Sequence, residues 1–149
     1  MSLFEKSVMP ERLGFRDMDI SLRHREWGYQ CPAVDIDFLM CEYDFGQVVA
    51  IIEYKHHNIK EIDPSKSSFK VIKNLADQRY TPIPFFVVMY WRDIWAFKVY
   101  PMNLKARVFC DTPTMMTEYD YVSMLYRIRR NFIKDELSEK LNRALPSEE

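Results

Sequence analysis

The chain has 149 residues, of which 48% are hydrophobic, 15% aromatic and 29% charged. This length is typical of one domain that buries a real core, and the apolar content excludes intrinsic disorder and fibrous classes. The formal net charge is -1, so the chain lacks the overall basicity that marks many nucleic-acid-binding proteins. We therefore expect a single domain over residues 1–149, and the total charge by itself indicates no partner.

Cysteine usage and hydropathy favour a reducing, cytoplasmic setting. Cys31, Cys41 and Cys110 form no CxxC pair, which argues against a disulfide framework or a zinc ribbon. We expect free, buried thiols. The N-terminus lacks the apolar core of a signal peptide. The longest apolar runs, 48–52 and 84–91, fall far short of the roughly 20 residues of a membrane helix, so we expect no membrane association.

The first half of the chain predicts a helix followed by a hairpin. A loosely helical pattern covers residues 17–25. From Val34 the spacing of the apolar residues changes, and residues 34–41 and 47–55 are predicted to form two strands rich in β-branched and apolar side chains. The loop Tyr43-Asp44-Phe45-Gly46 between them has hairpin length.

The second half adds a helix, a second hairpin and a final helix. Asp63-Pro64-Ser65 gives a helix start with a serine able to cap. The helix over 66–79 has one apolar face. Strands over 84–90 and 94–100 follow, and Thr117 begins a variant of the capping box before the last helix. The order indicates a mixed α/β domain. The apolar face of the middle helix consists of Phe69, Ile72, Leu75 and Ala76.

Acidic residues face each other across the first hairpin. A turn centred near Phe45 places Glu53 opposite Asp37, and the same register places Lys55 opposite Asp35. A slip of one or two residues stays open because the type of turn is not known. Opposed side chains lie about 4.5–5.5 Å apart, and residues two apart share a face. We therefore expect the four charged side chains on one side of the hairpin.

Two opposed carboxylates repel each other unless one takes up a proton or a cation neutralises them. Mg²⁺ suits such a pair, since it binds one or two carboxylates and keeps waters and substrate phosphate oxygens as further ligands. Near the turn both strands are apolar on both faces, as in strands covered on both sides. A neighbouring lysine can orient or deprotonate the attacking water. These parts predict metal-assisted hydrolysis of a phosphodiester.

The same residues resemble a known family. Asp37, followed sixteen positions later by Glu53-Tyr54-Lys55, is similar to the D…(D/E)xK signature of the PD-(D/E)xK nuclease superfamily. The flanking residues, 34–38 and 51–55, are close to small Holliday-junction-resolvase-like and phage-type members. The resemblance implies the restriction-endonuclease-like fold, in which a central mixed sheet is flanked by helices. The order of elements is similar too. It consists of an initial helix, a three-stranded antiparallel unit whose inner hairpin carries the motif, a helix and a further strand.

The resemblance also implies roles for individual residues. Asp37 and Glu53 would bind Mg²⁺ or Mn²⁺, and Lys55 would be the catalytic lysine. The Pro-Asp dipeptide of the family is absent, so which aspartate is the main ligand stays open, with Asp35 as an extra ligand or a supporting residue. Some members add an acid from the first helix, or a glutamine or lysine from the middle helix. The accessory candidates here are Glu26, Gln78 and, directly after the motif, His57.

Several residues have both a structural and a functional interpretation. Asp35 and Lys55 could form a surface ion pair beside a solvated Glu53, an arrangement worth about 0–1 kcal/mol. His56 and His57 are strand-end residues or phosphate contacts rather than zinc ligands, since no third ligand stands at metal spacing. A basic stripe on the middle helix could follow a phosphate backbone or be a solvated face. The stripe consists of Lys66, Lys70 and Lys73.

The tryptophans also have both a structural and a functional interpretation. They could stack on bases, but each sits in an apolar segment, where core packing is the default. The three are Trp27, Trp91 and Trp95.

Our first hypothesis is a small Mg²⁺-dependent nuclease, endo- or exonuclease, that hydrolyses DNA. An alternative from another class is a catalytically inactive nuclease-like fold that binds nucleic acid or serves in assembly, and a second alternative is an RNA-directed nuclease. A homodimer would extend the reach of so small a domain over a duplex. The charge pattern supports a nucleic-acid partner: residues 26–53 hold six acids and no Lys or Arg, whereas residues 55–79 hold six Lys/Arg against three acids.

Overall fold

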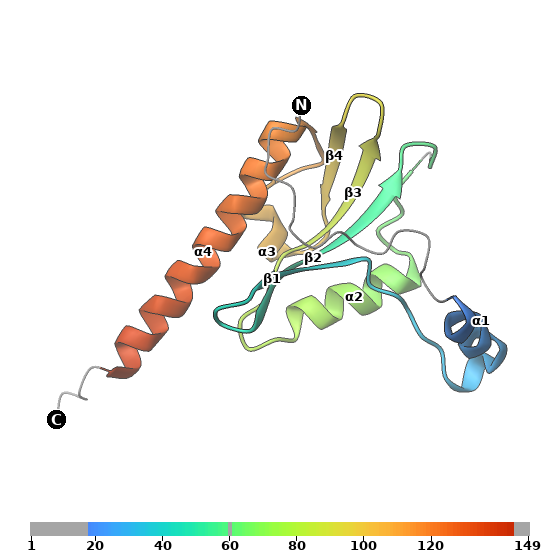
Figure 1. Ribbon diagram of the computed structural model, residues 1–149, viewed down its shortest axis with the longest axis horizontal. Helices are drawn as coiled ribbons and strands as arrows, with labels where there is room; N and C mark the ends of the chain where they lie inside the picture. Colours follow the sequence, from blue (N-terminus) through green and yellow to red (C-terminus); the bar gives the residue numbers. More distant parts are fainter. Residues whose placement is uncertain (1–17, 60, 145–149) are drawn as a thin grey trace. The chain divides into compact units, whose positions relative to one another are not determined.

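The computed structural model describes residues 18–59 and 61–144 (Figure 1). The chain divides between Asp35 and Ile36 into two compact units. The larger, C-terminal unit holds the sheet and most of the helical residues, and the described part of the other unit holds two short helices. All strands of the hairpin that carries the candidate site belong to the larger unit.

The first unit contains α1 (Asp19–Glu26) and the short 3-10 helix η1 (Gly28–Gln30). The predicted helix over 17–25 is thus present, one to two residues later in the chain, and position 17 lies outside the described residues. Gly28 has a φ of +75°, a left-handed conformation that glycine adopts without strain. His24 Nε2 lies 2.8 Å from the carbonyl oxygen of Cys31, which ties the turn back to the helix.

The second unit is a five-stranded mixed sheet with helices, which confirms the mixed α/β prediction. The strands lie in the order β1-β2-β3-β4-β5. The β2–β3 pair is parallel and the other neighbouring pairs are antiparallel. The strands are β1 (Phe38–Glu42), β2 (Gln47–His56), β3 (Phe85–Trp91), β4 (Ala96–Pro101) and β5 (Thr114–Thr117), and the helices are α2 (Ser67–Asp77), α3 (Leu104–Arg107) and α4 (Glu118–Ala144).

The elements differ from the sequence predictions in three respects. Among the described residues before α2 there are two strands, so the three-stranded antiparallel unit is not seen there. The short elements α3 and β5 were not predicted. The first strand begins at Phe38 rather than at residue 34, because its ladder with β2, its one neighbour among the described residues, ends at the Phe38–Ile52 pair.

The register of the β1–β2 hairpin changes once along its length. Phe38 pairs with Ile52, as the predicted register requires, whereas Cys41 pairs with Val48, one residue out of that register. The extra residue is Val49 in β2, and such a bulge shifts the alternation of faces by one. Val48 packs on the same core cluster as Ile51, and Val49 on the same cluster as Ile52, which is the reverse of what uninterrupted alternation would give.

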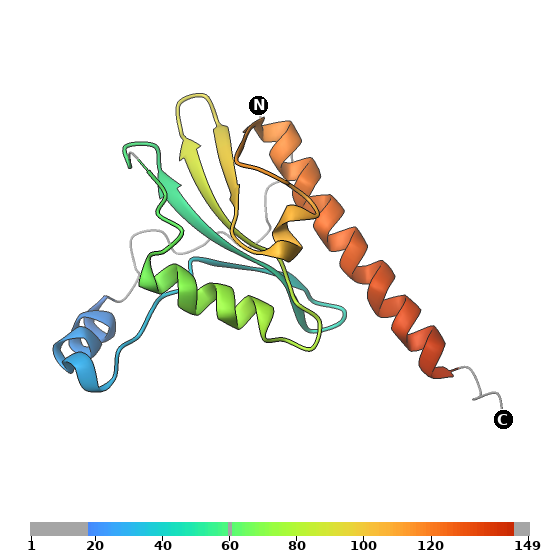
Figure 2. The same ribbon diagram turned by 180° about the vertical axis from the view of Figure 1, so that it is seen from behind.

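The two faces of the sheet are covered by different helices (Figures 1 and 2). On one face, Ile51, Phe85 and Val87 pack against α2. On the opposite face, Ile52, Phe86 and Val88 pack against α3 and α4. From α2, the residues Phe69, Ile72 and Ala76 are buried, whereas Leu75, predicted on the same stripe, is 50% exposed.

The outer strand of the hairpin is less covered than predicted. β1 is an edge strand, and Phe38 and Leu39 are about half exposed, while Val49 to Glu53 of β2 are buried. Coverage on both sides therefore holds for β2 and is wrong for β1. For the same reason Cys41 is exposed, as is Cys31 of the first unit, and only Cys110 is a buried thiol as predicted.

Of the two predicted helix N-caps, the one of α4 is confirmed and the one of α2 is wrong. Thr117 Oγ1 accepts a hydrogen bond from the backbone N–H of Asp120, as predicted for α4. Ser65 does not cap α2, because its hydroxyl and its N–H both donate to Asp63 Oδ1 and Lys66 takes the N-cap position. Within the described residues, no helix is both long and apolar enough to cross a membrane.

Candidate functional site

The Asp37 and Glu53 carboxylates meet at the open end of the β1–β2 hairpin. The backbone N–H of Asp37 donates to Glu53 Oε1 at 3.1 Å, and the backbone N–H of Tyr54 donates to Asp37 Oδ2 at 3.2 Å. These reciprocal bonds continue the pairing beyond the last ladder pair, Phe38 with Ile52. Each carboxylate is therefore held by the backbone of the opposite chain segment, which limits its movement.

The surroundings of the two carboxylates differ. Glu53 is 5% exposed in the middle of the sheet, while Asp37 is exposed. Burial raises the pKa of the Glu53 carboxyl above its ordinary value, and the charge of Asp37 raises that pKa further, against the opposing effects of the Asp37 N–H and the charge of Lys55. The site thus favours a proton on Glu53 or a cation beside it.

Lys55 follows Glu53 on the same face of β2. Its partner across the parallel ladder is Met89, and its Nζ lies 5.9 Å from the centre of the Phe69 ring on α2. Lys66, at the start of α2, places its own Nζ 5.5 Å from the same ring. A lysine of the motif and the first lysine of the basic stripe therefore approach the same aromatic side chain.

The basic stripe of α2 is solvent exposed, as a phosphate-binding or solvated face requires. Lys66 and Lys70 are exposed, and Lys70 lies one turn further along the helix. Lys73 is engaged in an ion pair with Asp77 at 3.1 Å. The end of the stripe nearest Lys55 is thus the part with positive charge available to a ligand.

The accessory candidates lie in different places. Glu26 pairs with Arg23 in α1, and Glu26 and Asp35 both belong to the first unit, so their part in the site stays a prediction. Gln78 follows α2 at its C-terminal end. Its neighbour Arg79 donates to Gln47 at the start of β2, which puts this end of the helix opposite the end near Lys55.

His57 comes directly after β2, the strand that carries Glu53 and Lys55. Its backbone N–H donates to the carbonyl of Tyr90, so the parallel ladder continues past the last residue of β2. Its imidazole lies in a near-parallel stack with Trp91, with ring centres 6.1 Å apart. The structure therefore joins His57 to an aromatic neighbour rather than to the carboxylates.

The number of ligands limits which metal could be held. Among the described residues, no three His, Cys, Asp or Glu side chains come together as a metal site. The pair of Asp37 and Glu53 fits Mg²⁺, which uses one or two carboxylates and fills its shell with waters and phosphate oxygens. It does not fit a zinc site, which uses three or four protein ligands.

The α4 face of the sheet carries polar groups that were not predicted from the sequence. The hydroxyls of Tyr54 and Tyr121 lie 2.5 Å apart, and burial raises the pKa of both. Glu42, 2% exposed, forms an ion pair with Arg129 of α4 and accepts the backbone N–H of Asp44. An acid at the end of an apolar strand is a weak signal, and its arginine partner lies far away in sequence.

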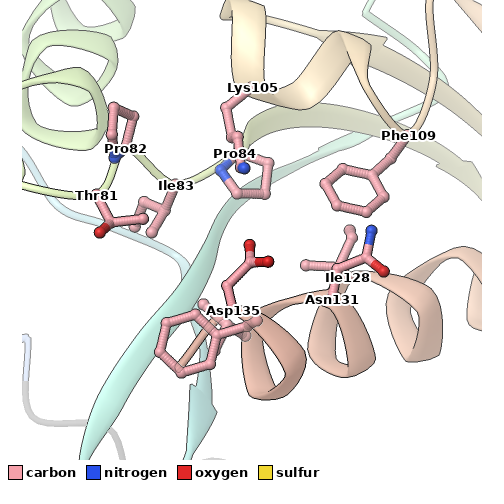
Figure 3. Close-up of a pocket in the computed structure, with 11 residues that line it drawn as sticks. Thr81, Pro82, Ile83, Pro84, Lys105, Phe109, Ile128, Asn131 and Asp135 are labelled. Atoms are coloured by element: carbon pink, nitrogen blue, oxygen red, sulfur yellow. The ribbon is translucent and has the colours of Figure 1, made fainter. Parts of the chain in front are cut away.

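A small pocket also opens on the α4 side of the sheet. Asp135 extends from α4 toward Pro84, and Asn131 lies near Phe109 (Figure 3). Its volume is about 30 Å³, room for one or two water molecules. None of the residues that line this pocket belongs to the Asp37–Glu53 site.

Comparison with known protein families, characterised proteins and solved structures finds no match to this chain. The functional conclusion therefore depends on the geometry of the site and on the resemblance of its residues to the nuclease signature.

Proposed function

We propose that this chain is a Mg²⁺- or Mn²⁺-dependent nuclease that hydrolyses phosphodiester bonds in DNA. The observation that supports it is the pair of carboxylates, Asp37 and Glu53, held together by backbone hydrogen bonds with Lys55 next on the same face. A buried acid with a raised pKa beside a second acid is a costly arrangement for stability alone. A divalent cation would remove that cost.

Each residue of the site would have its own role in the reaction. Asp37 and Glu53 would be the two protein ligands of the cation, and the backbone N–H groups that donate to Asp37 Oδ2 and Glu53 Oε1 hold both carboxylates in place. A bound Mg²⁺ would supply Lewis-acid activation of water and of the scissile phosphate. Lys55 would orient the attacking water or take its proton, and its charge would offset the charge that develops on the phosphate.

The surrounding charge supports a polyanionic substrate. Lys55 and Lys66 place their ammonium groups within 6 Å of the same Phe69 ring, at 5.9 and 5.5 Å from its centre. Lys70 continues this basic surface along α2. Basic side chains that neutralise phosphates supply most of the sequence-independent affinity for nucleic acid. A strand whose backbone follows α2 would thus reach the carboxylates.

The decisive experiment is cleavage of labelled single-stranded and duplex DNA by the full chain with Mg²⁺ or Mn²⁺. Glu53→Gln should abolish cleavage and weaken Mn²⁺ binding measured by electron paramagnetic resonance. Asp44→Asn is the matched control, because Asp44 is an exposed acid in the turn at the opposite end of the hairpin. Its cleavage rate should equal that of the wild type. Wild-type protein that cuts neither DNA nor RNA would overturn the proposal.

One observation favours a second candidate, a binding module without catalysis. The described residues bring together two carboxylates and no third metal-ligating side chain. In that case the full chain would bind nucleic acid through Lys66 and Lys70, and no cleavage would occur with either metal. Parallel assays with RNA of the same sequence separate a DNA-directed from an RNA-directed enzyme.

A further inference from the structure

Four aromatic rings gather where β2 and β3 end. His56 and His57 have ring centres 4.2 Å apart, and His57 stacks on Trp91 with 16° between the ring planes. His56 also meets Tyr90 edge to face at 5.6 Å. We call these four side chains the ring cluster. Both histidines are exposed, while Tyr90 and Trp91 are partly buried beneath them.

The His57–Trp91 pair of the ring cluster continues the line of the candidate site. Glu53, Lys55 and His57 are successive alternate positions of one chain segment, and the ladder to β3 extends through His57. Alternate residues of a strand are about 6–7 Å apart. The His57–Trp91 stack therefore lies one such step beyond Lys55 and two beyond Glu53, a distance that a single nucleotide strand can follow.

The packing around the neighbouring turn holds this end of the sheet rigid. Trp95 has a φ of +47°, a left-handed conformation that is unfavourable for a bulky residue. It stacks on Tyr90 at 6.5 Å and on Phe97 at 6.4 Å. These contacts hold the turn after Trp91 in place. The ring cluster is thus a preorganised surface rather than a loose group of side chains.

Charge favours a nucleic-acid occupant over an apolar one. Lys55 lies on one side of the ring cluster, and exposed Arg92 follows Trp91 directly, with Asp93 as the acid of the same turn. The exposed His57 imidazole, stacked on the Trp91 indole, forms a flat platform with a polar edge. Such platforms bind bases by stacking, and this mode tolerates any base because every base has a π-face.

We infer that the ring cluster binds an unpaired nucleobase of the strand that is cut at the Asp37–Glu53 site. Its substrate class is single-stranded nucleic acid, or a duplex with an unpaired end or flap, because a base inside a blunt duplex is stacked and cannot reach the platform. This inference rests on the proposed function, since it assigns the nucleotide next to the scissile phosphate.

The test is equilibrium binding of fluorescein-labelled oligonucleotides to the full chain, by anisotropy, in low-salt buffer with EDTA. We expect single strands to bind about 10-fold more tightly than a blunt duplex of the same length. His57→Ala and Trp91→Leu should each remove most of this preference, so that single-strand binding weakens up to about 10-fold while duplex binding stays unchanged. Tyr43→Ala is the control, a 92% exposed aromatic residue in the turn at the opposite end of β2.

The outcomes separate this inference from the proposed function. Equal affinity for single strands and blunt duplex, or unchanged single-strand affinity in a folded His57→Ala variant, would overturn the platform. Because His57 is exposed, that variant is informative even if Trp91→Leu does not fold. Metal-dependent cleavage without any preference for unpaired ends would keep the nuclease and reject the platform. Strand-selective binding without cleavage would keep the platform and reject the nuclease.

Discussion

Glu53 and Tyr54 are neighbours in β2, yet their side chains lie on opposite faces of the sheet and have different surroundings. Tyr54 points to the α4 face, where its hydroxyl meets Tyr121 and its ring packs edge to face with Phe38 and Tyr90. Glu53 points to the α2 face, where its neighbours are a second acid and a lysine. On the α4 face a buried polar group has an internal partner, which is what stability requires.

On the α2 face, the surroundings of the buried Glu53 are different. A buried carboxylate there meets another carboxylate, and burial raises its pKa. Perturbed ionisable groups beside like charges are concentrated at functional sites. Both faces contribute to the core, so the feature that distinguishes the α2 face is the buried Glu53 carboxyl beside a second acid.

The largest expected effect comes from Lys55→Met. This substitution keeps the aliphatic packing on Phe69 and removes the charge, so cleavage should fall about 10²- to 10⁴-fold while the fold stays intact. Lys98→Met is the control, since Lys98 is also a lysine over an aromatic ring, at 5.3 Å from the centre of Tyr100. Single-turnover cleavage rates and circular dichroism would measure both effects. Equal losses in the two variants would contradict a specific role for Lys55.

The next effect concerns the α4 face. Tyr54→Phe or Tyr121→Phe leaves the other buried hydroxyl without its partner, and each should lower the free energy of unfolding by about 1–3 kcal/mol. The double variant removes both hydroxyls and should cost less than the sum. Urea unfolding of the four proteins forms the double-mutant cycle. Additive losses would show that the two hydroxyls do not interact.

A smaller effect distinguishes Glu53 from an ordinary buried acid. Its pKa is raised in the folded state above the ordinary value of 4.5, so the folded protein holds the proton more tightly than the unfolded chain. The stability contributed by the protonated form is complete below that value and is lost as the pH rises through the higher, folded pKa. Without divalent metal, the melting temperature of the wild type should fall with pH across this interval more than that of Glu53→Gln.

A divalent metal ion should reverse this loss of thermal stability. Added Mn²⁺ at neutral pH should raise the melting temperature of the wild type, because binding to the folded state alone stabilises it. Glu53→Gln should not respond. A wild type whose melting temperature is the same with and without Mn²⁺ would count against a cation between Asp37 and Glu53.

The smallest effect is expected on the outer face of α2. Lys73→Ala removes a surface ion pair with Asp77 and should change the free energy of unfolding by about 0–1 kcal/mol. It should also change nucleic-acid affinity less than Lys66→Ala, because Lys66 lies at the end of the stripe near Lys55. The reverse order in anisotropy titrations would show that the binding surface extends toward the other end of α2.

Local patterns account for the parts of the fold that could be predicted. The hairpin and the placement of Asp37 opposite Glu53 depend on alternation and on a short loop, both of which are visible in sequence. The edge position of β1 could not be predicted, because it depends on where β3 pairs. The bulge at Val49 was missed for a similar reason, since an apolar run of valines and isoleucines looks the same with either face buried.

Long-range partners account for most of the site that was missed. Arg129 follows Glu42 by many residues, and nothing near Glu42 indicates an ion pair with the last helix. Core packing was the default expectation for the tryptophans, and Trp91 instead stacks with the exposed His57 at the end of the sheet. Side chains that meet only through the parallel β2–β3 pairing are outside the reach of local periodicity.

The edge position of β1 has a consequence for the behaviour of the protein at high concentration. Exposed edge strands offer free backbone groups to a second copy, and β1 adds exposed Phe38 and Leu39. The bulge opposite Met40 and Cys41 interrupts the flat edge such pairing would need. Where two copies do meet, the exposed thiol of Cys41 can link them on oxidation. Storage under reducing conditions should therefore keep samples free of covalent dimers.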